Sequence, residues 1–321
     1  MAPDADGDVL LGDLSAHIGR IHNGQWLPEI SLSLFSASPD PNGGAWFASY
    51  DRVRREVNGR FTDIKFPQSF LPHPQPVRIA SDNLGALWVS GSFSVLVLRG
   101  DKWTTVGLPP GFPGKTPTLV YADIAGRVWL GFKENAIMLI DGNAQRVLSE
   151  KDGLDVGAIL AVSVRGASTW IAGSNGLQFF DGERFRDITP PEGGSFGIIS
   201  GAAETSDGSL WLNAYRGIIH LAPPQVSRLK AGENREEYTL FETHDGLPGP
   251  TQQDQPYPSL IQATDGKLWF ATSAGPVWID PKDIPHNALP PPVAIRFITA
   301  TENDTHRSLI RTCRSRRAIW T

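Results

Sequence analysis

The sequence predicts an all-β fold, a β-propeller of about seven four-stranded blades. One phrase recurs along the chain: residues 207–212 read Asp-Gly-Ser-Leu-Trp-Leu and residues 265–270 read Asp-Gly-Lys-Leu-Trp-Phe, with looser copies elsewhere. The anchor residue of each copy stands at positions 10, 46, 88, 129, 170, 211 and 269, so the gaps are 36, 42, 41, 41, 41 and 58. A period in the low forties, with four short strands in each repeat, is typical of propeller blades.

The composition fits such a fold and excludes several classes of protein. The 321 residues are 40% hydrophobic and 20% charged, which favours a packed core over disorder. The formal net charge of -5 gives no electrostatic reason to expect a nucleic-acid partner. A single cysteine, Cys313, excludes an internal disulfide.

The anchors predict the packing between blades. The first is Leu10, and the other six, which we expect to be buried, are Trp46, Trp88, Trp129, Trp170, Trp211 and Trp269. Placement at one position in every repeat favours core packing over stacking on sugars. The Asp and Gly of each phrase favour a capped tight turn over a calcium loop, which needs several oxygen ligands within about a dozen residues. The copies at 82–89 and 123–130 suggest a turn that is longer than the one at 207–212.

One repeat shows all four predicted strands. Residues 160–164 form an apolar run, 169–173 a second β-rich run, 177–180 a third and 185–188 an alternating fourth. Turn residues separate these runs, including Asn175-Gly176, a pair that favours tight hairpins.

The two ends of the repeat series look incomplete. The first blade, at residues 6–30, has no innermost strand before residues 9–11, and the last, at about 256–280, lacks an outer strand. These gaps do not complement each other within one blade, so we expect an imperfect seam. Between the last two anchors lies a polar insertion at 223–237. The predicted propeller spans residues 6–288.

The repeat resembles a known family. The pattern Asp-x-x-Gly-x-Leu-Trp-Leu-Gly-x-x-x-Gly-Leu-x-x-Phe-Asp-Gly is similar to the two-component regulator propeller repeat. The Asp-Gly-Leu phrases at 152–154 and 245–247 resemble its links between blades. The resemblance covers roughly residues 6–297. It implies the extracytoplasmic sensor region of a hybrid sensor histidine kinase or a related regulator.

The C-terminal residues 289–321 are expected to lie outside the ring. A proline run at 290–292 stands where the family joins its propeller to a Tyr-rich β-sandwich module, and only the start of such a module fits. Five arginines follow Asp304, at positions 307, 311, 314, 316 and 317. A basic tail for membrane phosphates or nucleic acid is one interpretation. A solvated or truncated tail is the favoured one.

No signature of catalysis is present in the sequence. There is no Gly-x-Ser-x-Gly elbow, no His-Glu-x-x-His motif and no phosphate loop. The seven histidines show no metal-ligand spacing. We therefore expect no enzyme activity, no metal and no cofactor, and the kinase part of the implied parent is not in this chain.

Function is expected where the repeats differ from each other. The connection from the second to the third strand is Ser174-Asn175-Gly176 in the regular blade, and several blades depart from it. The departures place aromatic, basic and amide groups on one expected face, around the channel mouth, where they would bind a small molecule or a glycan. The predicted ligand-binding residues are Tyr50, Arg52, Phe93, Lys133, Asn135, Tyr215 and Arg216.

The resulting hypothesis is a non-catalytic ligand-sensing module. Its partners would be a small ligand and the adjacent sensor and kinase domains of a longer protein, with no nucleic acid and with membrane contact only through segments outside this chain. The resemblance implies a periplasmic location, and because no signal peptide precedes the first repeat, we expect an internal piece of that longer protein. The alternatives are a propeller lyase or hydrolase resembling streptogramin lyases, and a protein-binding scaffold.

Overall fold

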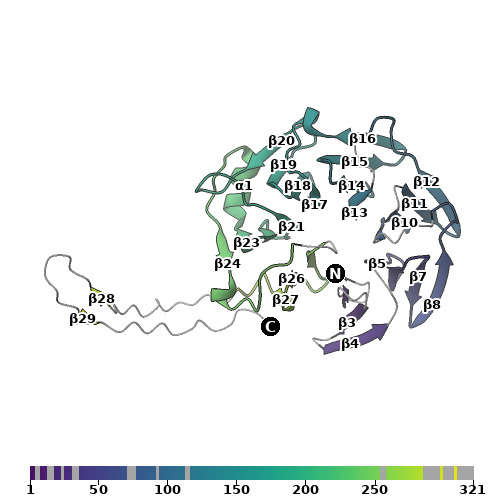
Figure 1. Ribbon diagram of the computed structural model, residues 1–321, viewed down its shortest axis with the longest axis horizontal. Coiled ribbons are helices and arrows are strands. Elements are labelled where there is room, and N and C mark those ends of the chain that lie inside the picture. The colour runs from purple at the N-terminus through teal and green to yellow at the C-terminus, as the bar shows by residue number, and fades with distance from the viewer. Residues whose placement is uncertain are drawn as a thin grey trace.

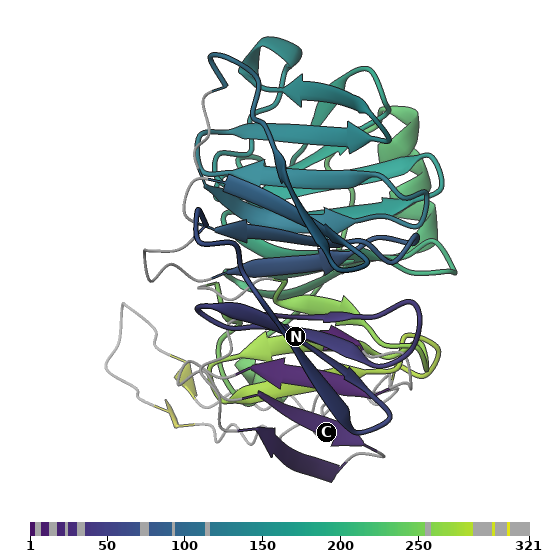
Figure 2. The same ribbon diagram turned by 90° about the vertical axis from the view of Figure 1, so that its right-hand side faces the viewer.

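The computed structural model describes residues 1–3, 8–12, 18–22, 25–30, 36–70, 77–91, 94–112, 116–253, 258–284, 297–298 and 307–308. Seven antiparallel sheets stand around a central axis and form a propeller (Figure 1). Seen from the side, the ring is a disc with its strands stacked blade upon blade (Figure 2). The predicted all-β propeller of about seven blades is confirmed.

Each blade is a meander that runs outward from the axis. The innermost strands are β1 (Ala2–Pro3), β5 (Ser36–Pro39), β9 (Arg78–Ser81), β13 (Pro117–Ala122), β17 (Ile159–Arg165), β21 (Ile199–Glu204) and β25 (Leu260–Gln262). The second strands are β2 (Val9–Gly12), β6 (Ala45–Ala48), β10 (Leu87–Gly91), β14 (Val128–Phe132), β18 (Ser168–Gly173), β22 (Leu210–Ala214) and β26 (Leu268–Thr272).

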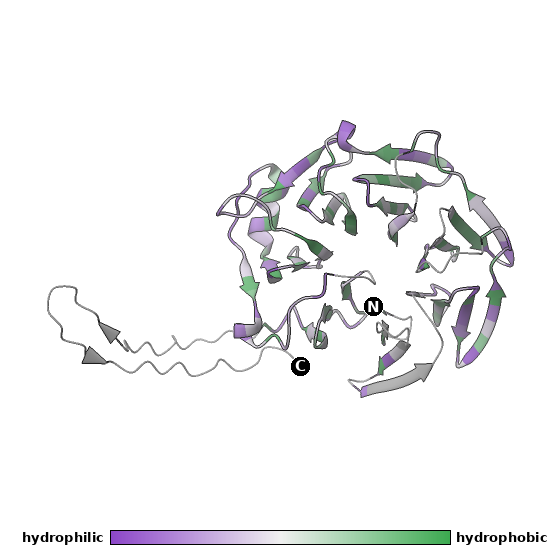
Figure 3. Ribbon diagram, in the orientation of Figure 1, coloured by the Kyte–Doolittle hydropathy of each residue, from purple (hydrophilic) through white to green (hydrophobic). Residues whose placement is uncertain are grey.

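The outermost strand of most blades is the most exposed one, whereas the third strand is largely buried. The third strands are β3 (Ile18–His22), β7 (Arg52–Val57), β11 (Ser94–Arg99), β15 (Ala136–Asp141), β19 (Gly176–Phe180), β23 (Gly217–Leu221) and β27 (Gly275–Ile279). The fourth strands are β4 (Gln25–Ile30), β8 (Arg60–Lys65), β12 (Lys102–Val106), β16 (Ala144–Leu148), β20 (Phe185–Ile188) and β24 (Thr239–Phe241). Hydrophobic residues concentrate on the inner and middle strands (Figure 3). Among the described residues, the seventh blade has three strands.

The turn between the first and second strands explains the repeated phrase. In the third blade, Asp82 Oδ1 accepts the backbone N–H groups of Leu84 and Ala86 at 3.0 and 2.9 Å, and its Oδ2 accepts the indole Nε1–H of Trp88 at 2.9 Å. One carboxylate thus ties the turn to the anchor, and Gly85 takes the positive φ of 80° that the turn requires.

The predicted extension of this turn in the third and fourth blades is wrong. The hydrogen bond from the Gly85 N–H to Asp82 O has its counterpart from the Gly208 N–H to Thr205 O, and both turns are closed by one further backbone bond across the same span. The turns therefore have equal length, and the glycine stands three residues before the tryptophan in both. What differs is the position of the capping aspartate. Asp82 is the first residue of its turn, whereas Asp207 stands inside the turn that begins at Thr205 and accepts the Ser209 N–H at 3.1 Å.

The six tryptophan anchors are buried between neighbouring blades. Trp170 is 0% and Trp269 7% exposed, and the other four lie between these values. Trp170 packs in a cluster that runs from the fifth blade into the sixth, with Leu212 and Phe196. Its ring also meets Phe179 edge-on at 4.9 Å. Burial of these faces requires neighbouring blades, as expected for a repeat fold.

The seam differs from its prediction in one respect. The first blade does have an innermost strand, because Ala2 and Pro3 pair with Leu10 and Val9. This strand could not be predicted from the sequence, because Ala-Pro shows no alternation of polar and apolar residues and contains no β-branched residue. The ring therefore begins before the predicted start at residue 6. Val9 packs with Ile261 and Trp269 of the seventh blade, so side-chain packing closes the described ring. In the described part of the chain, no sheet contains strands from both ends.

Pro276 explains why the outer edge of the seventh blade is a poor place for a fourth strand. Ile218 occupies the equivalent position in the sixth blade and pairs with Phe241 of the outer strand. Pro276 pairs inward with Ala271 and has no N–H to donate outward. Proline on an edge strand discourages further strand pairing.

The polar insertion between the last two anchors forms helix α1 (Pro223–Ala231). The helix buries Val226 and Leu229 against the fifth and sixth blades. Short 3-10 turns at Glu150–Asp152 and Thr243–Asp245 precede the next blades, at the predicted Asp-Gly-Leu links.

Beyond the ring, β28 (Phe297–Ile298) pairs with β29 (Arg307–Ser308). The rest of the predicted tail, with its proline run and most of its arginines, lies outside the described residues. The division at residue 288 stays a prediction. In the described part of the chain, the single α-helix is too short to cross a membrane.

Candidate functional site

The connections between second and third strands lie together on one face of the ring. Because successive strands of a meander run in opposite directions, all these connections leave the blades on the same side. Tyr50, Lys133 and Tyr215 stand in these turns in blades two, four and six, and all three are exposed, Tyr215 by 70%. Phe93 lies outside the described residues. We call this side the predicted face.

The side chain of Asn135 is engaged in hydrogen bonds within the protein. Its side-chain N–H donates to Leu154 O at 2.7 Å, and its Oδ1 accepts the N–H groups of Val156 and Gly157 at 3.2 and 3.1 Å. Asn135 also takes the left-handed φ of 51°, which asparagine tolerates. It therefore holds the link between blades four and five, which limits its availability to a ligand.

Arg52 is bound to two carboxylates on its own blade. It lies 2.7 Å from Asp51 Oδ2 and 3.0 Å from Asp63 Oδ2. Asp63 also pairs with Arg54, and hydrogen bonds from Arg54 and Arg52 lower the pKa of Asp63 to about 2. These contacts occupy much of the guanidinium.

Arg216 belongs to an exposed network on blade six. Its Nη1 donates to Glu192 Oε1 at 2.8 Å, and the Tyr238 hydroxyl donates to the same oxygen at 3.0 Å. Hydrogen bonding to this carboxylate raises the pKa of Arg216. Tyr50, Lys133 and Tyr215 are thus exposed in turns of three different blades, whereas Arg52, Asn135 and Arg216 bind neighbouring groups. The role of the predicted set in binding a ligand stays a prediction.

The structure reveals a cavity of about 480 Å³ on the axis of the ring. The innermost strands of all seven blades contribute to its wall, and most lining side chains are small or aliphatic, such as Ala80, Ala161 and Ala202. The volume is in the range of small-molecule pockets. Sequence reasoning missed this cavity, although the alanines that recur in the innermost strands were a readable signal.

The cavity lies towards the face opposite the predicted one. Ile124, Arg165 and Gln262 line it, and they stand at or just beyond the outgoing ends of β13, β17 and β25, next to the turns that lead to the second strands. Ile124 is 82% exposed and marks the mouth. We call this side the cavity face.

The wall of the cavity offers backbone hydrogen-bonding groups. Each innermost strand is paired within its blade on one side only, so its other edge is directed to the axis. Serines satisfy some of these groups across blades: Ser38 Oγ accepts the Ser81 N–H at 2.9 Å and Ser163 Oγ the Glu204 N–H at 3.2 Å. Other edge groups are placed to meet water or a ligand.

Two charged side chains line the cavity, Arg165 and Glu204. Glu204 is neutralised by Lys230 of helix α1 at 2.7 Å and accepts the Trp170 indole N–H at 2.7 Å. Arg165 is exposed and makes no ion pair among the described residues. Tyr121 stands beside it and hydrogen-bonds the backbone of Val164, and burial raises its pKa. The uncompensated charge at the mouth is therefore positive.

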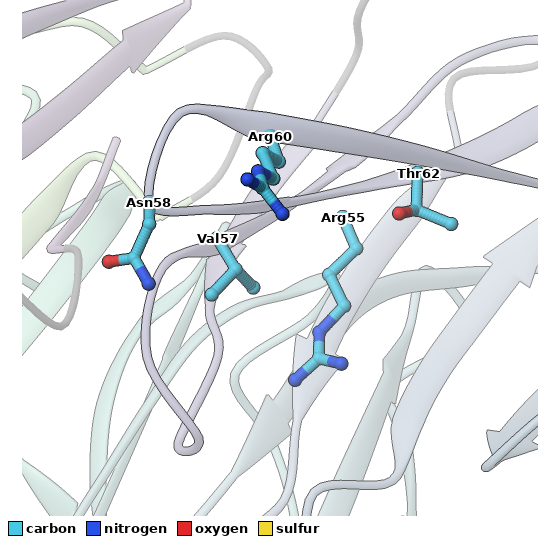
Figure 4. Close-up of a pocket in the computed structure, with 5 residues that line it drawn as sticks. All are labelled: Arg55, Val57, Asn58, Arg60 and Thr62. Atoms are coloured by element: carbon cyan, nitrogen blue, oxygen red, sulfur yellow. The ribbon is translucent and has the colours of Figure 1, made fainter.

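A second hollow lies on the β7–β8 hairpin, with a volume of about 550 Å³ (Figure 4). Arg55, Val57, Asn58, Arg60 and Thr62 line it. Arg55 is already paired with Asp40 at 2.5 Å and lies over the Trp46 ring. Because one hairpin supplies the whole lining and Arg55 is already paired, the hollow is a weaker candidate than the axial cavity.

The described residues contain no group of three or more His, Cys, Asp or Glu that could hold a metal ion. His220, one of the histidines, stacks on the buried Trp211 ring at 4.1 Å, which gives it a packing role. The expectation of no enzyme activity stays a prediction.

Comparison with known proteins supports the fold. No protein-family model and no curated protein sequence matches the chain. YCF48 bound to a D1 peptide has a TM-score of 0.63 at 11% identity, covering 86% of this chain and 90% of that one. The WD40 propeller domain of Doa1 has a TM-score of 0.59 at 11% identity, covering 85% and 88%.

An extracellular domain from B. thetaiotaomicron matches with a TM-score of 0.45 at 13% identity, over 92% of this chain and 49% of that one, which is too low to support an argument about function. The chain is thus similar to seven-bladed propellers, and this similarity establishes its fold.

Proposed function

We propose that this chain is the ligand-sensing propeller module of a two-component signalling protein, located in the periplasm and without catalytic activity of its own. The repeat phrase and its links support this proposal through their resemblance to the sensor-region repeats. The axial cavity carries it, because the innermost strands of all seven blades converge around one open-mouthed cavity of about 480 Å³.

The position of the cavity suits a sensor. A ligand there contacts innermost strands that are far apart in the sequence, from β5 to β25. Binding therefore favours one relative arrangement of the blades, and a stiff ring can transmit that preference to an attached domain. The domains that receive the signal would be those of the longer protein.

A second candidate, a protein-binding scaffold, is favoured by one observation on the cavity face. Leu84 and Ile124 are 88% and 82% exposed in adjacent blades. Asn83 Nδ2 donates to Ile124 O at 3.1 Å, which joins their two turns. Contiguous exposed apolar surface is typical of protein contact sites, and these two side chains would be the centre of such a surface.

A cysteine-protection experiment tests the primary proposal. In a Cys313→Ser background, Val164→Cys places a thiol at the cavity wall, where Val164 is half-buried. Tyr215→Cys places a matched thiol on the predicted face. A small-molecule and glycan library is screened for compounds that slow the modification of each thiol by a methanethiosulfonate reagent.

We expect compounds that protect the thiol at position 164 and leave the one at position 215 reactive. Protection at 215 alone would move the site to the predicted face. If no compound protects either thiol while a bound peptide partner covers Leu84 and Ile124, the scaffold replaces the sensor.

A further inference from the structure

We propose that the axial cavity selects a small hydroxylated anion, such as a sugar acid, whose carboxylate binds Arg165 at the mouth of the cavity face. This inference rests on the proposed function, because it takes the cavity to be the ligand site. It adds the charge of the ligand, the direction from which the ligand enters and the residue that selects it.

Charge is the first argument. Of the two charged side chains in the cavity wall, Glu204 is held by Lys230 and Trp170 at 2.7 Å each, so it attracts no cationic ligand. Arg165 makes no ion pair within the described chain. The nearby carboxylate of Asp123 does not compete for Arg165, because it is bound by Arg127 Nε at 2.8 Å and by Trp129 Nε1 at 3.0 Å. Among the charged side chains of the described wall, Arg165 is therefore the one left to pair with a ligand.

Geometry is the second argument. Arg165 is the last residue of β17 and opens the turn to β18, where Gly166 has a positive φ of 59°. Arg165 therefore stands at the rim of the cavity, which Tyr121 and Ile124 also line. A planar guanidinium binds a carboxylate through two parallel hydrogen bonds, which a neutral ligand cannot reproduce.

The cavity wall is the third argument. Small side chains leave the edges of the innermost strands accessible, and these edges present backbone N–H and C=O groups in alternation. Hydroxyl groups both donate and accept hydrogen bonds, so a hydroxylated body fits this wall better than an aliphatic one. A ligand with a carboxylate at the rim and hydroxyl groups along the cavity wall is a sugar acid.

The test compares D-glucuronate with D-glucose, which differ in a single carboxylate. Binding is measured by calorimetry on the full chain, and the Val164→Cys protection assay locates it. The variants are Arg165→Ala, Arg165→Lys and, as a matched control on the rim of the same blade, Arg184→Ala. Both arginines are exposed, so these variants are expected to fold.

We expect glucuronate to protect the thiol at position 164 and to bind about 10-fold more tightly than glucose. Arg165→Ala should remove this preference, Arg165→Lys should keep part of it, and Arg184→Ala should leave it unchanged. If Arg165→Ala and Arg184→Ala weaken the binding of glucuronate equally, the effect comes from the loss of positive charge on the blade and not from a contact with Arg165. That result would contradict the assignment.

Other outcomes separate the two proposals. Equal binding of glucose and glucuronate in the cavity would overturn the inference and leave the sensor proposal standing. The same holds if only neutral or cationic library compounds protect the thiol at position 164. If no compound protects the thiol at position 164 or the one at position 215, both proposals fail.

Discussion

Blades five and seven have the same meander but differ in how completely they are built. Blade five has four strands, and its anchor Trp170 is fully buried with its indole N–H bonded to Glu204. Blade seven has three described strands, and its anchor Trp269 is 7% exposed, with no hydrogen-bond partner for its indole N–H among the described residues. The same repeat phrase can thus stand in blades that differ in strand number and in the burial and hydrogen bonding of the anchor. We therefore expect local stability to vary around the ring.

The largest expected effect is truncation of the two anchors. Trp170→Ala should cost about 3–5 kcal/mol of unfolding free energy, since it opens a cavity in a closed core and removes a donor from Glu204. Trp269→Ala should cost less, about 2–3 kcal/mol, because its surroundings can collapse more readily. Denaturant unfolding measures both, and equal costs would remove the contrast between the blades.

Ion pairs give the next largest effect. Glu204→Gln should destabilise the protein by about 2 kcal/mol, because Glu204 is buried and serves both Lys230 and Trp170. The control in blade seven is Asp265→Asn, whose pair with the half-buried Lys267 lies at the surface and contributes at most about 0.5 kcal/mol. A larger loss from the exposed pair would contradict the ranking.

Local opening is the third comparison. The amides of β27 should exchange with solvent faster than those of β19, because among the described residues β27 is paired on one side only, whereas β19 is paired on both sides. Hydrogen exchange followed by mass spectrometry measures this at peptide resolution. Slower exchange in β27 would indicate that a further strand covers this edge.

The smallest effect concerns the response of blade two to acid. The folded pKa of Asp63 is lowered to about 2 by Arg54 and Arg52, below the usual value of about 3.9. Its contribution is therefore complete above pH 4 and is lost as the pH falls towards 2. Because the pair is exposed, we expect at most about 1 kcal/mol. In Asp63→Asn the acid-dependent part should vanish; an unchanged profile would assign it to other carboxylates.

The sequence predicted the fold well because its information is local and repeated. The 41-residue spacing and the four strands of blade five could be read directly, and the strands differ from their predicted bounds by no more than one residue. β1 could not be read, since two residues carry no periodicity.

The candidate site was predicted poorly because it depends on contacts between distant residues. Asn135 looks like a variable loop residue, yet its partners lie 19 to 22 residues away. Arg216 and Glu192 are 24 residues apart. The cavity arises only when seven strands close around an axis, which no single repeat reveals.

The most direct test of the axial cavity as the ligand site is hydrogen exchange on the full chain with and without a compound that protects the thiol at position 164. The cavity predicts slower exchange in the innermost strands of several blades, including β13, β17 and β21, with the turns at 49–51, 133–135 and 215–216 unchanged. Protection confined to those turns would contradict it and would place the ligand on the predicted face.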